Sequence, residues 1–486
     1  MDISTLHPAP VWRHFSTLCR IPRASGQERA LRDELAAWAR ARGLGVKVDA
    51  IGNLVLSKPA SPGYENRPGV VLQGHLDMVC QKNGGSAHDF ARDPVRPVLR
   101  DGWVTAGDTT LGADNGIGVA LALAVLEAGD LVHPALEVLL TVDEEAGMHG
   151  ALGLKADAVQ GRLLLNLDTE EWGELYIGCA GSADVIADAP LPTEAPTPGW
   201  QAVSVRLSGL AGGHSGIDIH RLRGNAIKLL AGLLYEFAET NVDFQLATLA
   251  GGTAHNAIPR EAEATLCLAD ATRLQAVADR HLERLRRELT SEDSGVRIEI
   301  APSVVTPGAA LTGEATRRVV ALLHGLPYGV RAMSQDMPAV VETSNNIGEA
   351  RLADGRLHVN AMVRSLREDG IRRLAAEIVY LFSVAGVDHV QATGAGPGWI
   401  PNPDSRLLAL AQDVYRRTFG GEATVQVIHA GLECGVFGAL WPEMDMISFG
   451  PTIRGAHSPG ERVEAASVER AWRLLTGILA DIPARL

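Results

Sequence analysis

The stretch Val70–Asp77 (Val-Val-Leu-Gln-Gly-His-Leu-Asp) decides the fold class, because an apolar run of strand length ends directly in polar residues. Two more apolar runs of this kind, 136–142 and 163–165, follow along the chain. Residues 116–128, between the first two runs, are rich in Ala and Leu and have the length of a helix. Alternating helices and apolar strands predict an α/β fold, a mostly parallel sheet with helices on both faces.

The pattern changes after Pro190, where four prolines lie close together and indicate a linker or domain edge. Residues 202–300 then show the order strand, helix, strand, strand, helix, strand, which is typical of a split βαβ unit. A weaker copy without a clear first strand covers 316–391, and a Gly/Pro-rich break follows at 394–403. We therefore predict an inserted α+β domain of two such units, residues 189–396, that interrupts an α/β domain formed by 1–188 and 397–486.

Composition excludes several classes of protein. The 44 Lys and Arg against 58 Asp and Glu give a net charge of −14, which argues against a nucleic-acid partner because phosphate contacts need clustered cations. The chain start lacks the basic and apolar pattern of a secretory signal, and its longest apolar stretch is too short to span a bilayer. The five cysteines are scattered and form no CxxC pair. We expect a cytoplasmic protein without disulfides and without a membrane partner.

Acids and histidines follow the apolar strands. Each of four strands leads to such a residue, and a further acid precedes the helix at 116–128; the set is His75, Glu144 with Glu145, Asp168, His457 and Asp114. Ligand sites form at the carboxyl edge of open α/β sheets, so these side chains are expected to meet. Two histidines with several carboxylates and no cysteine suit Zn²⁺ or Mn²⁺, and they suffice for two metals if one carboxylate bridges them.

Two neighbours of these residues have candidate roles. Asp77, two residues after His75 in an extended segment, is placed to orient that imidazole. Glu144 stands beside a ligand and suits a general base. Each residue also has a structural alternative: a surface histidine, a solvated turn, or a helix cap at Asp114. The shared position at one sheet edge favours the metal site over these alternatives.

The inserted domain carries its own polar candidates. His214 lies among glycines and suits an oxyanion donor, whereas Arg364 suits a carboxylate partner and Asn256 is a further polar candidate. For all three, spacing alone favours local turn chemistry or a surface salt bridge.

Several motifs along nearly the whole chain together resemble the M20 family of di-zinc peptidases, and within it the aminoacyl-histidine (Xaa-His) dipeptidase branch, which includes carnosinase-like enzymes. These motifs are Gly74–Val79, Leu111–Gly116, Asp143–Glu145, Asn166–Glu171, Gly213–Gly216, His429–Gly435 and Gly455–Glu461. The resemblance implies that the α/β domain is catalytic and that the inserted domain is a lid. Smaller relatives use this lid for dimerisation, which makes a homodimer a candidate assembly.

The resemblance also implies roles for the metal-site residues. One zinc would be held by His75, Asp114 and Asp168, and the other by Asp114, Glu145 and His457, with Asp114 bridging. Mn²⁺ or Co²⁺ would be substitutes for the two Zn²⁺. Asp77 would orient His75, and Glu144 would be the general base.

For the substrate, the resemblance implies contacts from both domains. His214 would lie near the scissile carbonyl, and Asn256 and Arg364 would bind the substrate carboxylate. The charge and motif of Glu433 suggest a contact with the substrate's free amine.

The expected function is metal-dependent hydrolysis of unblocked dipeptides, including Xaa-His dipeptides such as β-alanyl-histidine. Within enzymes, an M20 aminoacylase or carboxypeptidase is the alternative. From another class, a non-catalytic metal-dependent binding protein is the alternative, and the intact Glu144 argues against it.

Overall fold

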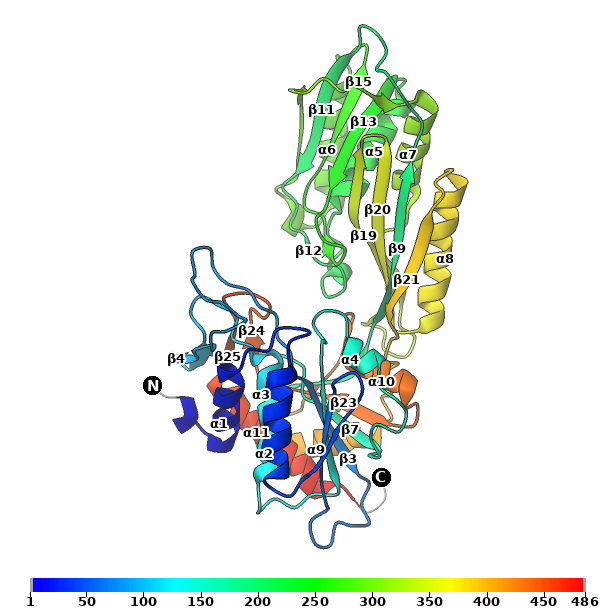
Figure 1. Cartoon of the computed structure of the whole chain (residues 1–486). Coiled ribbons are helices and arrows are strands. Elements are labelled where there is room, and N and C mark those ends of the chain that lie inside the picture. The colour runs from blue at the N-terminus through cyan, green and yellow to red at the C-terminus, as the bar shows by residue number, and fades with distance from the viewer. Residues whose placement is uncertain (1–2, 484–486) are drawn as a thin grey trace. The chain divides into compact units, whose positions relative to one another are not determined.

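The computed structural model describes residues 3–483 and places β3 (Val70–His75) near the middle of an eight-stranded sheet (Figure 1). The strand order is β1 (Gly45–Val48), β2 (Leu54–Lys58), β6 (Leu136–Thr141), β3, β7 (Leu163–Asn166), β23 (Asp445–Ser448), β8 (Glu174–Cys179) and β22 (Thr424–Ile428). The neighbours β6, β3, β7 and β23 run parallel, and all six residues of β3 are buried. The predicted α/β fold with a mostly parallel central sheet is confirmed.

Helix α3 (Ala113–Glu127) is the central helix of this part of the chain. Every residue from Asn115 to Leu126 is buried, and the helix contacts α1 (Ala9–Arg20), β3 and α11 (Ala465–Asp481). A helix that is apolar all round must be enclosed by other elements, which explains its composition. The other helices are α2 (Arg29–Arg40), α4 (His149–Leu152), α9 (Arg406–Phe419) and α10 (Glu433–Leu440).

A small four-stranded sheet carries the last predicted ligand. Its order is β24 (Ile453–Arg454), β25 (Arg462–Glu464), β5 (Trp103–Thr105) and β4 (Val98–Arg100). β24 and β25 pair in antiparallel fashion, so residues 455–461 form the connection between them. His457 therefore lies on a hairpin loop whose two ends are fixed.

The chain divides into two units. Unit 1 contains the described residues up to Cys179, 399–427 and those from Leu432 on, whereas unit 2 contains 180–398 and 428–431. The limits 188/189 and 396/397 stay a prediction of the domain boundaries. The proline cluster that suggested a domain edge lies inside unit 2.

Unit 2 is built on one sheet of nine strands, in which two split βαβ units are joined. The first consists of β11 (Gln201–Ser208), α5 (Ala226–Glu239), β13 (Phe244–Gly251), β15 (Ala262–Leu268), α6 (Leu274–Glu288) and β16 (Arg297–Pro302). Its strands lie in the order β16-β11-β15-β13, with antiparallel neighbours. This is the arrangement expected for a split βαβ unit.

The second split βαβ unit takes its first strand from a part of the sequence that precedes the first split βαβ unit. Its elements are β9 (Gly181–Pro190), α7 (Gly313–Gly325), β19 (Val341–Ala353), β20 (Arg356–Ser365), α8 (Glu368–Val384) and β21 (Val390–Gly396), with β18 (Gly329–Met333) added beside β19. β9 lies between β20 and β21, and the predicted boundary at residue 188 falls inside it. The first split βαβ unit is thus inserted between β9 and α7, which are the first strand and the first helix of the second split βαβ unit.

One hydrophobic core serves both split βαβ units. β13 pairs with β19, and the buried apolar residues of the strands and of α5 to α8 form a single cluster. Burial alternates along β9, as expected for a sheet with one covered face. Within residues 3–483, no helix combines the length and the apolar character needed to cross a membrane.

Candidate metal centre

The residues predicted to bind metal meet in unit 1 at the carboxyl ends of its parallel strands. His75 is the last residue of β3, β6 leads into the turn with Glu145, and β7 leads to Asp168. Asp114 stands at the start of α3, and His457 lies on the loop between β24 and β25. The parallel order β6-β3-β7-β23 gives these strand ends one shared edge.

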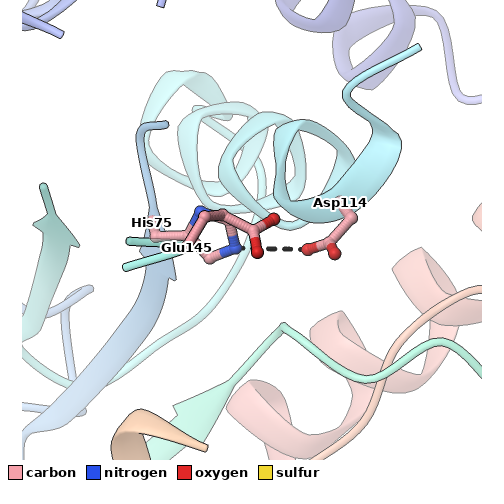
Figure 2. Close-up of side chains that lie close together, drawn as sticks. All are labelled: His75, Asp114 and Glu145. Carbon is pink, nitrogen blue, oxygen red and sulfur yellow. Dashed lines mark hydrogen bonds and ion pairs between the residues drawn. The ribbon is translucent and has the colours of Figure 1, made fainter. Parts of the chain in front are cut away.

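Asp114 lies between the two histidines. Its Oδ1 is 3.2 Å from Nε2 of His75, and its Oδ2 is 3.2 Å from Nε2 of His457. Asp168 Oδ1 is 3.3 Å from the same nitrogen of His75, and Glu145 Oε2 is 3.1 Å from that of His457. Two histidine–carboxylate groups therefore share one carboxylate. Figure 2 shows His75, Asp114 and Glu145 directed toward one another, and their ligand atoms lie within 4.8 Å.

The protein's own charges strongly perturb this site. Burial alone would lower the pKa of His75, but Asp168, Asp114 and Asp77 outweigh it and hold that pKa well above its usual value. Burial raises the pKa of Asp168 to about 6, and hydrogen bonds with Asp114 and Glu145 raise the pKa of His457 to about 11. The carboxylates therefore favour positive charge at this site, and a bound cation would supply it.

The donor set fits divalent cations. Among the described residues, Glu145 Oε1 is a buried oxygen without a hydrogen-bond partner. A buried carboxylate oxygen left in this way is costly, and a cation would satisfy it. Imidazole nitrogens with carboxylate oxygens are a zinc- or manganese-type donor set.

Asp77 contacts both His75 and the turn that carries the predicted base. Its Oδ1 lies 3.4 Å from Nδ1 of His75 and accepts the N–H of Glu144 at 3.0 Å, while its Oδ2 accepts the N–H of Glu145 at 3.0 Å. Burial opposes ionisation, but hydrogen bonds from His75, Ser25 and Glu144 lower the pKa of Asp77 to about 2. An ionised Asp77 therefore orients the ring of His75 and holds the backbone of Glu144 and Glu145.

Two residues near the chain start take part in this arrangement and were not predicted. Glu28, which is buried, accepts the N–H groups of Gly26 and Asp143, both at 2.9 Å. Ser25 donates to Asp77 Oδ2 at 2.8 Å. The turn 143–145 is thus held through three consecutive N–H groups by the two carboxylates.

Glu144, which is partly buried, and Glu433, which is fully buried, are acids close to the ligands. Burial raises the pKa of Glu144 well above its usual value and that of Glu433 to about 7. Oε2 of Glu433 accepts hydrogen bonds from Gln73 at 2.5 Å and Thr141 at 2.7 Å, whereas its Oε1 has no hydrogen-bond partner among the described residues. Glu433 therefore contacts side chains at the ends of β3 and β6, and one of its carboxylate oxygens is left for a ligand.

The three candidates of the inserted domain lie in unit 2. Arg364, on β20, is only 6% exposed, and burial lowers its pKa to about 10. Its Nε donates to Ser215 Oγ at 3.4 Å, and among the described residues no carboxylate lies within ion-pair distance of its guanidinium. A buried guanidinium without a carboxylate suits an anionic ligand.

His214 has a defined hydrogen-bonding role at Nδ1. The N–H groups of Gly216 and Ile217 donate to this nitrogen at 3.1 and 3.0 Å. Nδ1 therefore acts as an acceptor, and the neutral ring carries its proton on Nε2. Asn256 is exposed, and its backbone oxygen accepts the N–H of Ser215 at 2.8 Å.

His429 was not predicted as a site residue, although it opens one of the motifs that carry the resemblance, His429–Gly435. It is buried in unit 2, and its Nε2 lies 2.8 Å from Ser344 Oγ. Burial first, and then the positive charge of Arg364, lowers the pKa of His429 to about 3, so the ring is neutral. Only the tertiary structure places this late residue beside Arg364.

Comparisons with known proteins show the family and the fold. The sequence profile of peptidase family M20/M25/M40 matches residues 71–481. The cytosol non-specific dipeptidase of Escherichia coli (strain K12) is 43% identical over 486 residues, which is 100% of both chains. The crystal structure of aminoacylhistidine dipeptidase from Vibrio alginolyticus is 42% identical, with a TM-score of 0.89 over 99% of this chain and 98% of that chain.

A more distant structure shares the fold alone. Human carnosine dipeptidase 1 is 12% identical, with a TM-score of 0.51 over 97% of this chain and 95% of that chain.

Proposed function

The chain belongs to peptidase family M20/M25/M40, and from that premise we propose that it is a metallodipeptidase that hydrolyses unblocked dipeptides, including those ending in histidine. The observation that carries the proposal is the pair of histidine–carboxylate groups that share Asp114 beside Glu144, an acid with a raised pKa. A protein that only bound metal would have no use for such an acid at this position.

The metals of this proposal are two Zn²⁺ per chain, with Mn²⁺ or Co²⁺ as substitutes. His75, Asp114 and Asp168 would hold one, and Asp114, Glu145 and His457 the other. When bound, such ions polarise a peptide carbonyl and make a water more acidic.

Glu144 is the proposed general base. Burial among other acids gives its carboxyl group a raised pKa, which suits proton exchange near neutral pH. Glu144 takes the proton of the attacking water and then delivers it to the nitrogen of the departing amine. Asp77 orients His75 and holds the backbone of Glu144 during both transfers.

The substrate contacts are proposed from charge and hydrogen-bonding capacity. Arg364 binds the carboxylate of the dipeptide, with Asn256 as a second polar contact, and His214 donates from Nε2 to the developing oxyanion. Oε1 of Glu433, which has no hydrogen-bond partner among the described residues, accepts a hydrogen bond from the protonated free amine of the dipeptide.

We also place the protein in the cytoplasm, as the word cytosol in the name of the E. coli relative suggests. A homodimer is the assembly we propose. Neither nucleic acid nor a membrane is a proposed partner, in keeping with the net charge of −14.

The test is release of free histidine from β-alanyl-histidine and Gly-His, with N-acetyl-histidine as control. Chelated protein and protein reconstituted with Zn²⁺ or Mn²⁺ are compared. Metal-dependent cleavage of the two free dipeptides alone supports the proposal. Cleavage of the acetylated substrate would indicate an aminoacylase, and metal binding without any cleavage would favour a binding protein.

A further inference from the structure

We propose that Glu461 is a positioning residue that sets the place of the bridging ligand Asp114, an inference that rests on the proposed metallodipeptidase function. The carboxylate of Glu461 accepts four consecutive backbone N–H groups. Oε2 accepts those of Leu111 and Gly112 at 2.7 and 2.9 Å, and Oε1 accepts those of Ala113 and Asp114 at 2.7 and 3.2 Å. The last of these N–H groups belongs to the bridging residue itself.

The energetics favour a rigid arrangement. Glu461 is only 2% exposed, and a buried carboxylate is costly unless it is fully hydrogen-bonded. The first N–H groups of α3 have no partner inside the helix, and Gly112, at the N-cap position, has no side chain to cap them. The carboxylate of Glu461 therefore gives these N–H groups an acceptor, and they give the buried carboxylate its donors, through charge-assisted hydrogen bonds at a helix N-terminus.

The position of Glu461 in the sequence links two ligands. It lies four residues after His457, on the same loop between β24 and β25. His457 in turn lies 3.2 Å from Asp114. Glu461 thus holds the backbone of one ligand while its own loop carries another, which fixes the distance between them.

Arg23 contacts the segment before Asp114 through a carbonyl group, whereas Glu461 contacts it through N–H groups. Its guanidinium donates to the oxygen of Gly112 at 2.6 Å and to those of Leu76 and Asp77 at 2.9 and 2.7 Å. Gly112 has a φ of +70°, and a Cβ there would lie 2.4 Å from a terminal nitrogen of Arg23. The loop before Asp114 is therefore fixed through its N–H groups and through one C=O group, by side chains of opposite charge.

The substitution Glu461→Gln tests the proposal. An amide keeps one acceptor oxygen and turns an NH₂ group toward N–H donors, so half of the hydrogen bonds are lost. We expect the affinity for the two metals to fall about 10–100-fold, the range seen when groups that orient metal ligands are removed. The kcat should fall with it while KM changes less than about twofold, because Glu461 is not among the proposed substrate contacts.

The matched control is Glu137→Gln. Glu137 accepts the N–H groups of Gln160 and Gly161 at 2.7 and 2.8 Å, away from the candidate metal ligands. The readouts are metal affinity by chelator competition, the visible absorption spectrum of the Co²⁺-loaded protein, and thermal unfolding of the metal-free protein. We expect an altered Co²⁺ spectrum only for Glu461→Gln.

The readouts separate the two proposals. If the wild-type protein binds Co²⁺ and Glu461→Gln matches it in affinity, spectrum and kcat, the role of Glu461 is overturned and the metallodipeptidase proposal is untouched. If the wild-type protein binds no metal, the proposed function itself fails. Should Glu461→Gln not fold, Glu461→Asp keeps the charge with a shorter reach, and wild-type metal affinity in that variant would equally overturn the role.

Discussion

At the scale of single residues, Glu144 has the most specific expected effect. Replacing it by Gln keeps its size and the backbone hydrogen bond to Asp77 but removes proton acceptance. We expect kcat on Gly-His to fall about 10²–10⁴-fold, the usual contribution of a general base. Metal content, measured by elemental analysis, should stay at the wild-type value.

Asp114→Ala is the contrasting variant. It removes the carboxylate that lies 3.2 Å from both histidines, so metal content should fall together with activity. Wild-type turnover by Glu144→Gln would contradict the assigned base.

His255 and Asp184 form an ion pair with a pH dependence that can be measured directly. Nδ1 of His255 lies 3.1 Å from Asp184 Oδ1, and this hydrogen bond raises the pKa of the histidine above 6.5. The folded-state pKa exceeds the unfolded one, so the stabilisation is fully present below pH 6.5. It is lost as the pH rises through the folded-state pKa.

The measurement is an NMR titration of His255 in the wild type and in Asp184→Asn. We expect a lower histidine pKa in the variant. The His255 side chain is 45% exposed, so solvent screening limits the pair to less than about 1 kcal/mol. An unchanged pKa would show that Asp184 does not stabilise the protonated form of His255.

The sequence predicted side chains that contribute their own functional atoms, but not those that act on the backbone. His75, Asp114 and His457 carry recognisable ligand chemistry next to strands, and the structure brings them together. Glu28 and Glu461 act by accepting N–H groups of distant loops. Such contacts have no residue pattern of their own, because every residue except proline offers the same N–H group.

At the scale of elements, α3 depends on a glycine at its closest approach to another segment. A Cβ at Gly118 would lie 2.3 Å from the oxygen of Leu167, next to the candidate ligand Asp168. Replacing a helix-interior glycine by alanine is normally stabilising by up to about 1 kcal/mol. Here we expect Gly118→Ala to destabilise by about 1–3 kcal/mol, the cost of overpacking, and to lower metal content.

Gly129→Ala is the control, because a Cβ at that position meets nothing within 4 Å. Urea unfolding of both variants gives the comparison. A stabilised Gly118→Ala protein would mean that α3 and the segment 166–168 have room to separate.

The elements found from the sequence are those with a strong period or a strong apolar run. β3, β6 and β7 are recognisable because both of their faces are covered. β9 was missed, since it precedes a proline cluster and lies more than a hundred residues before the rest of its unit. Its pairing with β20 and β21 is a long-range contact that no local pattern indicates.

At the scale of the whole molecule, the thiols should be almost inert. Cys19, Cys179, Cys267 and Cys434 are buried, and Cys80 is partly exposed. Burial also raises the pKa of the Cys80 thiol, so the fraction of reactive thiolate is small.

We expect a chromogenic disulfide reagent to label one thiol slowly in the native protein and all five after denaturation. The variant Cys80→Ser should show no native labelling. Rapid reaction of two or more thiols would contradict the burial of the other four.

The place of β23 has a consequence for biosynthesis. This strand fills the gap between β7 and β8, yet about 280 residues separate its start from the end of β7, and a ribosome needs roughly 15–60 s to add them. During that time all of unit 2 is translated, and β7 and β8 lack the strand that pairs between them. His457 is translated later still, so the nascent chain cannot complete its metal centre before this residue is added.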